Sequence, residues 1–132
     1  MIAILLAVVI TWPEFFAHAT PHGLEYSAKL HQLAGTRVVL RGYSVAKPAI
    51  DGGILLTHFP YSEPHDLDET DVPYDAVAVI WRKGIALPPI PRRPTIEGTL
   101  RLGNRSHSGQ MTAVTLEDAV PASKEVTQSQ RR

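Results

Sequence analysis

Apolar and polar positions alternate over much of the chain, which predicts short strands rather than long helices. Five segments rich in β-branched residues carry the pattern and are separated by turn-forming residues: 36–45, 52–59, 75–81, 94–103 and 110–120. In residues 94–103 the apolar positions lie on one side of the strand, namely Ile96, Gly98, Leu100 and Leu102. Residues 75–81 are apolar on both sides, so we expect this strand to be covered on both faces or to lie deep in a barrel.

These strands predict an all-β fold. Gly42 lies in the middle of the first strand, where it indicates a bulge or a sharp bend. Five short strands with a bent first strand favour a five-stranded OB-like antiparallel barrel, closed or nearly closed, over residues 36–121. An SH3-like barrel or a small sandwich has a similar number of strands, and both remain alternatives.

The other segments of the body are assigned from their local pattern. Residues 24–35 have the spacing of a short amphipathic helix within a lead-in over 20–35, and Gly35 would end the helix. The proline-rich segment 82–93 cannot be helical and should run extended across the surface. Residues 122–132 are polar and charged without an apolar period, so we expect a disordered tail.

The N-terminus is typical of a signal peptide. Residues 2–10 form an unbroken apolar run, too short for the roughly 20 residues of a spanning helix. Ala17-His18-Ala19 then supplies the small-x-small pattern of a cleavage site, so residues 1–19 are predicted to be a removed leader. The alternative is a buried N-terminal strand, because Val8, Val9 and Ile10 favour β structure. On the first interpretation the mature protein is periplasmic or secreted and has no integral membrane span.

The charge balance and the absence of cysteine argue against several classes of function. The 13 basic and 13 acidic side chains cancel, so no overall field attracts nucleic acid or anionic lipid. The absence of cysteine excludes disulfides, thiolate metal sites and cysteine nucleophiles. His107 lies between Ser106 and Ser108, but no nucleophile elbow surrounds them, and we expect the protein not to be an enzyme.

An acidic loop over residues 58–75 is the main candidate for chemistry. Imidazole and carboxylate ligands without sulfur would suit zinc or copper, and five residues could supply them: His58, His65, Asp66, Asp68 and Asp71. The loop lacks the glycine of a calcium-binding EF-hand and any HExxH helix. The alternative is a solvated loop whose aspartates satisfy nearby backbone donors. No other cofactor is expected.

Single-stranded nucleic acid is a second alternative ligand. OB barrels bind single strands with basic grooves and stacking aromatics. The candidates here are Arg37, Arg41, Tyr43, Trp81, Arg82, Lys83, Arg92 and Arg93. Neutrality and export both make this partner unlikely.

The order of the strand segments along the chain resembles that of a bacterial family of small exported proteins of unknown function. The family's pattern is L-x-G, V-x-I/L-x-G-Y and a late V/I-x-G-x-L strand, and it is matched over about residues 30–121 by Leu33, Gly35, Val38, Leu40, Gly42, Tyr43, Ile96, Gly98 and Leu100. The resemblance implies an OB-like, periplasmic or lipid-anchored protein with no established activity. Members often carry cysteines in the loop after the second strand, which this chain lacks, so the resemblance gives little support to a metal site.

The sequence therefore predicts an exported OB-like binding or accessory module. Its ligand would be a protein partner, such as a periplasmic or envelope protein, or a small ligand. Aromatic and proline residues would form the docking surface, because prolines lose little further entropy on binding. The predicted contact residues are Phe59, Tyr61, Trp81, Pro88 and Pro89.

Overall fold

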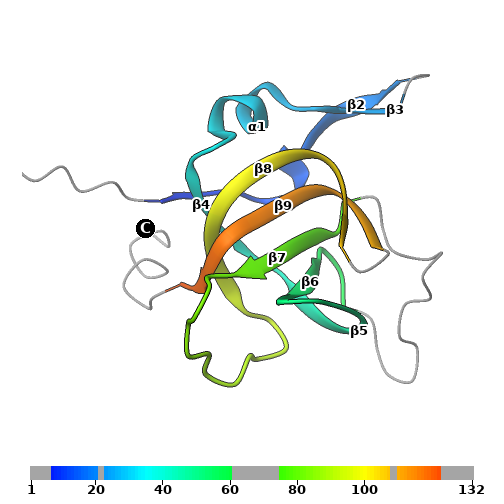
Figure 1. Ribbon diagram of the computed structural model, residues 1–132. Coiled ribbons are helices and arrows are strands. Elements are labelled where there is room, and N and C mark those ends of the chain that lie inside the picture. The colour runs from blue at the N-terminus through cyan, green and yellow to red at the C-terminus, as the bar shows by residue number, and fades with distance from the viewer. Residues whose placement is uncertain (1–6, 21–22, 61–74, 108–109, 123–132) are drawn as a thin grey trace, which may run out of the picture.

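The computed structural model describes residues 7–20, 23–60, 75–107 and 110–122. Within these ranges the chain forms nine strands, one α-helix and one short 3-10 helix (Figure 1). The strands are β1 (Val8–Val9), β2 (Phe16–Thr20), β3 (Gly23–Tyr26), β4 (Arg37–Arg41), β5 (Tyr43–Ile50), β6 (Gly53–Thr57), β7 (Val77–Trp81), β8 (Thr95–His107) and β9 (Gln110–Pro121). The helices are η1 (Trp12–Glu14) and α1 (Ala28–Leu33). The predicted all-β class is confirmed.

Seven of the strands form one curled sheet in the order β1-β4-β8-β9-β7-β6-β5, and β2 pairs with β3 separately. The long strands β8 and β9 arch over β7, and the β2–β3 pair extends away from the curled sheet (Figure 1). The β1–β4 and β7–β9 pairs are parallel and the other pairs antiparallel. The prediction was a five-stranded antiparallel barrel, closed or nearly closed; instead the sheet has seven strands, is not closed, and contains two parallel pairs.

The first predicted strand is bent at Gly42, which separates β4 from β5. A Cβ at Gly42 would lie 2.7 Å from Cζ2 of Trp12 and 3.0 Å from the carbonyl oxygen of Thr57, so a larger residue does not fit. At the bend, the amide of Gly42 donates to the carbonyl of Pro94 over 3.2 Å. Two residues further on, the amide of Ser44 donates to the carbonyl of Arg92 over 2.8 Å. The end of the proline-rich segment thus lies extended beside β5.

Two predicted boundaries differ from the structure. The predicted strand over 94–103 is longer in the structure, since β8 continues to His107 and a register shift lies between Leu102 and Arg105. The predicted helix over 24–35 is shorter, because residues up to Tyr26 pair with β2. The helix α1 begins after Ser27, whose side chain accepts a hydrogen bond from the Leu30 amide. Gly35 follows the helix with φ +83°, in the left-handed region that favours glycine.

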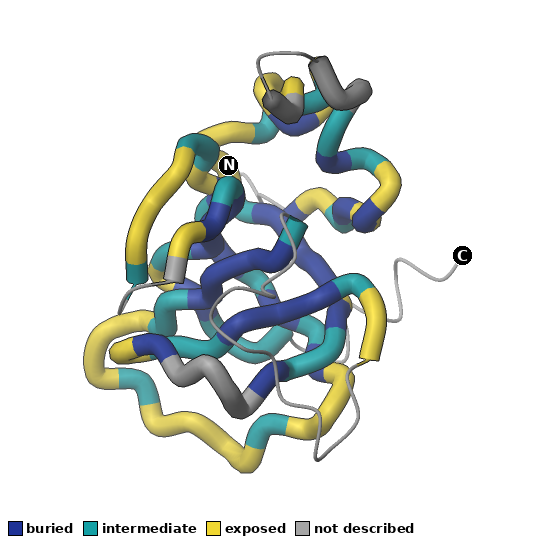
Figure 2. Tube along the Cα trace, turned by 90° about the vertical axis from the view of Figure 1, so that its right-hand side faces the viewer, coloured by how far each residue is buried: buried dark blue, intermediate teal, exposed yellow. Residues whose placement is uncertain are grey.

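The core lies inside the curl of the sheet, where the buried stretches of the strands cross (Figure 2). The alternation predicted for residues 94–103 is confirmed, since Ile96 and Leu100 are fully buried. A second, smaller cluster of Val45, Ile50, Leu55 and Ala78 packs on the other face of β6 and β7. The prediction that residues 75–81 are covered on both faces is therefore confirmed.

The segment predicted to be a leader contributes to this core. Ile10, Trp12 and Phe15 are buried in the same cluster as Leu40 and Leu100. The short strand β1 pairs in parallel with β4, and the amide of Ile10 donates to Val39 over 2.9 Å. This arrangement is the buried N-terminal strand that the sequence offered as the alternative. Removal of residues 1–19 remains a prediction, and it would take these side chains out of the core.

In the ranges that the structure describes, no helix has both the length and the apolar character needed to cross a membrane.

Candidate binding surface

His58, the first of the predicted metal ligands, lies directly after β6 within an aromatic stack. Its ring stacks on Trp12 at a centroid distance of 5.5 Å and an interplanar angle of 7°, and on Phe59 at 4.2 Å. Across the described residues there is no cluster of three or more histidine, cysteine or acidic side chains placed to hold a metal ion. His65, Asp66, Asp68 and Asp71 lie outside the described residues, so the metal site stays a prediction.

Trp12 anchors the base of this stack in the core. Its side chain is 8% exposed and stacks on Phe15 at 5.0 Å. The indole N–H donates to the backbone carbonyl of Arg41 over 2.8 Å. This hydrogen bond satisfies the indole nitrogen, which would otherwise be buried without a partner. Trp12 begins the helical turn η1, whose first residues are held by Glu14 accepting from the Thr11 amide over 2.9 Å.

Phe59 forms the outer end of the stack and is 64% exposed. Its backbone is held in place because the hydroxyl of the buried Thr57 donates to the Phe59 carbonyl over 2.8 Å. We call Trp12, His58 and Phe59 the aromatic stack. It leads from a buried indole to an exposed phenyl ring whose stacking restricts its rotamers, so the ring would lose little entropy on binding.

The other predicted contact residues do not join the aromatic stack. Trp81 is half-buried against the core, and its amide donates to Gly52 at the beginning of β6, whereas Phe59 follows the end of β6. Pro88 and Pro89 are exposed in the connection between β7 and β8. Tyr61 lies outside the described residues. Phe59 thus follows the end of β6, whereas Trp81, in β7, lies beside its beginning.

The basic residues considered for nucleic acid separate into paired and unpaired groups. Arg37 donates to Glu97 over 2.8 Å and contacts Asp118 at 3.4 Å, and Arg82 donates to Asp118 over 2.9 Å. The hydrogen bond from Arg82 holds the pKa of the Asp118 carboxyl below its ordinary value of 3.8, and the charges of Arg82 and Arg37 act in the same direction. The same contact raises the pKa of Arg82. These two arginines are therefore neutralised by neighbours.

Arg41, Arg92 and Arg93 are exposed and form no ion pair with another described residue. The Arg93 guanidinium lies over the Tyr43 ring at 5.2 Å from its centroid. Such cation–π contacts order an arginine without neutralising its charge.

Sequence reasoning missed Trp12, because it assigned the residue to a leader. The local pattern that could have revealed it is Thr11-Trp12-Pro13-Glu14. A threonine followed three residues later by glutamate, with proline in the first turn, is typical of a helix start in a folded domain. In the structure the Thr11 hydroxyl and amide both donate to the Glu14 carboxylate.

No protein-family model matches this chain, and no curated protein matches it in sequence. Among solved structures, the chain is similar to a DUF3299 family protein from Pseudomonas aeruginosa PAO1, with a TM-score of 0.56 and 15% sequence identity. The alignment covers 89% of this chain and 97% of that protein. At this identity the similarity concerns the fold alone. A neighbour from a family of unknown function agrees with the unknown-function part of the resemblance seen in the sequence.

Proposed function

We propose that this protein is an exported, non-catalytic binding module that docks a protein partner on the aromatic stack. The observation that carries the proposal is Phe59, an aromatic residue 64% exposed at the end of a stack whose other end is fixed in the core. Large aromatic residues held in place account for much of the binding energy at protein interfaces. Leaving such a ring in water is costly unless a partner covers it.

An OB-like interpretation of the sheet supports a binding role. Only Gly42, where the chain bends, separates the consecutive strands β4 and β5. The two strands nevertheless have different partners: β4 pairs with β8, and β5 pairs with β6. If β4 and β5 are counted as one bent strand, they connect both ends of the set β6, β7, β9 and β8 into a five-stranded, partly open barrel. Barrels of this class commonly bind ligands through their strands and loops.

The proposed export rests on the apolar run over residues 2–10. Export by way of this run is compatible with the described fold only if the chain is not cleaved after Ala19, because Ile10, Trp12 and Phe15 then remain in the core. Localisation is tested by fractionation of the native cells. A soluble cytoplasmic pool with the initiating methionine intact would contradict export.

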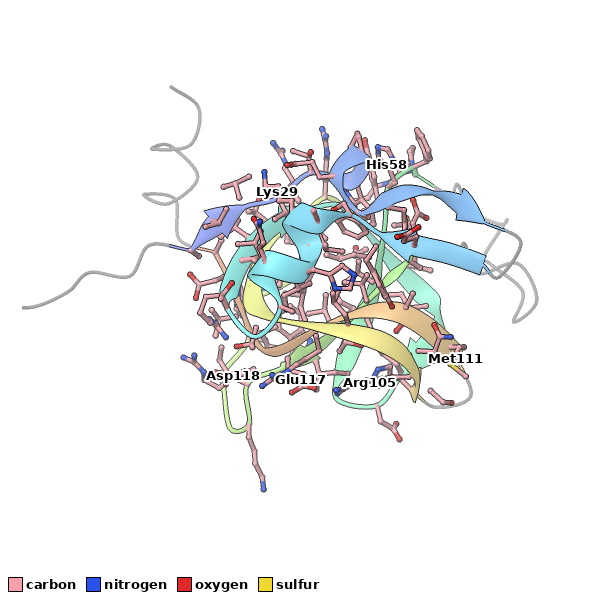
Figure 3. The ribbon with its side chains drawn as sticks, turned by 90° about the horizontal axis from the view of Figure 1, so that it is seen from above. Lys29, His58, Arg105, Met111, Glu117 and Asp118 are labelled. Atoms are coloured by element: carbon pink, nitrogen blue, oxygen red, sulfur yellow. The ribbon has the colours of Figure 1, made fainter. Side chains whose placement is uncertain are left out.

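Photo-cross-linking in the native cells tests the docking site. We would place p-benzoylphenylalanine at Phe59 and, as a matched control, at Met111, which is 59% exposed. Met111 lies well away from His58 (Figure 3). The proposal predicts a discrete protein adduct from position 59 that is absent from position 111. Adducts of equal yield from both positions, or none from position 59, would refute it.

A further inference from the structure

Among the residues that the structure describes, the exposed arginines near β8 and β9 form ion pairs with carboxylates, whereas those near β5 form none. Arg101 lies 3.5 Å from Glu117, and Arg105 pairs with the same carboxylate. Glu117, Asp118 and Arg105 lie along one side of the molecule, away from His58 (Figure 3). With Arg37, Arg82 and Glu97, these residues form a network in which four arginines share three carboxylates. Such surface networks contribute little binding capacity for further anions, because each cation already has a partner.

The unpaired arginines converge at the bend between β4 and β5. Arg41 precedes Gly42, whose amide donates to Pro94, and Ser44 donates to Arg92, so both segments lie side by side. The Trp12 indole that stacks on His58 also donates to the Arg41 carbonyl over 2.8 Å, so the backbone of Arg41 lies beside the base of the aromatic stack. We call Arg41, Arg92 and Arg93 the arginine patch. It is joined to the aromatic stack through the hydrogen bond from Trp12 to the Arg41 carbonyl.

We propose that the partner of this surface is an acidic polypeptide segment that carries an apolar side chain next to its carboxylates. This inference rests on the proposed function and specifies the chemistry of its partner. Arginine binds carboxylates through paired N–H donors, and such charge-assisted hydrogen bonds are stronger than neutral ones. The apolar side chain of the partner packs on Phe59, while the carboxylates meet Arg41 and Arg92.

The geometry favours an acidic peptide over single-stranded nucleic acid. Sequence-tolerant binding of single strands requires a row of aromatic faces on which successive bases stack. Arg93 already covers the Tyr43 ring, and Phe59 is the sole aromatic residue of the described chain in the exposed class. One free ring beside three arginines fits one apolar residue flanked by a few acidic ones. The zero net charge also provides no long-range field for a polyanion.

The test measures binding of a fluorescein-labelled peptide, in which glutamates flank one phenylalanine, by fluorescence anisotropy with the full-length protein. The variant Arg41→Gln/Arg92→Gln removes the arginine patch charges. The control Arg101→Gln/Arg105→Gln removes the same amount of charge from the paired network. We expect at least about a ten-fold loss of affinity in the first variant and little change in the second. Circular dichroism confirms that both variants are folded.

Three outcomes would overturn the inference: no saturable binding by the wild type, equal losses in the two variants, or tighter binding of an oligothymidylate than of the peptide. Its failure is distinguishable from failure of the proposed function through the cross-link at position 59. If that cross-link persists undiminished in Arg41→Gln/Arg92→Gln, the docking site stands and the acidic chemistry is wrong. If position 59 gives no cross-link even in the protein that keeps all its arginines, the docking site itself is wrong.

Discussion

The indole N–H of Trp12 donates to the backbone carbonyl of Arg41 over 2.8 Å, at the point where Gly42 bends the chain. This contact joins the N-terminal segment to the strand that carries Arg41. It also places the Trp12 ring where His58 stacks on it. One buried side chain therefore contacts the bend at Gly42, the backbone of Arg41 and the ring of His58.

Trp12→Ala should lower the free energy of unfolding by about 3–5 kcal/mol, because it leaves a cavity and an unsatisfied carbonyl. Urea denaturation monitored by far-UV circular dichroism measures the change. Val8→Ala is the control, since Val8 is exposed on the edge strand and should cost less than about 1 kcal/mol. Equal, small effects of both substitutions would contradict the packing of the N-terminal segment.

Gly42→Ala should destabilise the fold by about 1–3 kcal/mol, because its methyl group would overlap the Trp12 ring and crowd the Thr57 carbonyl. A double-mutant cycle with Trp12→Phe assigns the cause. If the overlap with the indole dominates, the cost of Gly42→Ala falls by more than about 0.5 kcal/mol when the smaller ring is present. Strict additivity would attribute the cost to the backbone bend instead.

Tyr26→Phe should cost about 1–3 kcal/mol, because the Tyr26 hydroxyl donates to the Ala113 carbonyl over 2.7 Å and accepts from the Gly103 amide over 2.9 Å. These two bonds hold β3 against β8 and β9. The matched control is Tyr43→Phe, since the Tyr43 hydroxyl makes no hydrogen bond to another described residue. The control should change stability by less than about 0.5 kcal/mol, and an equal loss in both variants would contradict the assignment.

Asp118 should make stability depend on pH in acid. Its folded pKa lies below the ordinary 3.8, so its contribution is present above that value and is lost as the pH falls through the folded pKa. Asp118→Asn removes the charge while tolerating φ +50°. The stability difference between wild type and variant should be constant near neutral pH and shrink in acid. A stability difference between wild type and variant that grows as the pH falls would contradict the prediction. High salt should weaken the effect, because the pair is exposed.

The sequence predicted the strands well wherever period and turn residues agreed. Residues 75–81 and 94–103 were placed by their apolar alternation, and Gly42 was identified as the bend of the first strand. It could not predict that β1 would add in parallel to β4, or that β8 would continue past Gly103. Those features depend on pairing between distant segments, which a local pattern does not encode.

The candidate site was predicted only in part. Phe59 was predicted to be a contact residue and is exposed, but its contact role stays a prediction, and its support comes from Trp12, which the pattern of residues 2–19 assigned to a leader. An apolar run has the same sequence pattern whether it belongs to a cleaved signal peptide or to the core of the folded domain. Likewise, arginines that are equivalent in sequence differ in structure, because only some of them meet Glu97, Glu117 or Asp118.

The mass of the protein isolated from its native compartment tests the account most directly, since the aromatic stack exists only if residues 10–15 are retained. Intact-mass spectrometry should find a folded chain that begins at or before Ile10. A stable, exported product beginning at Thr20 would contradict the account, because it would lack Ile10, Trp12 and Phe15 and with them the base on which His58 and Phe59 stack.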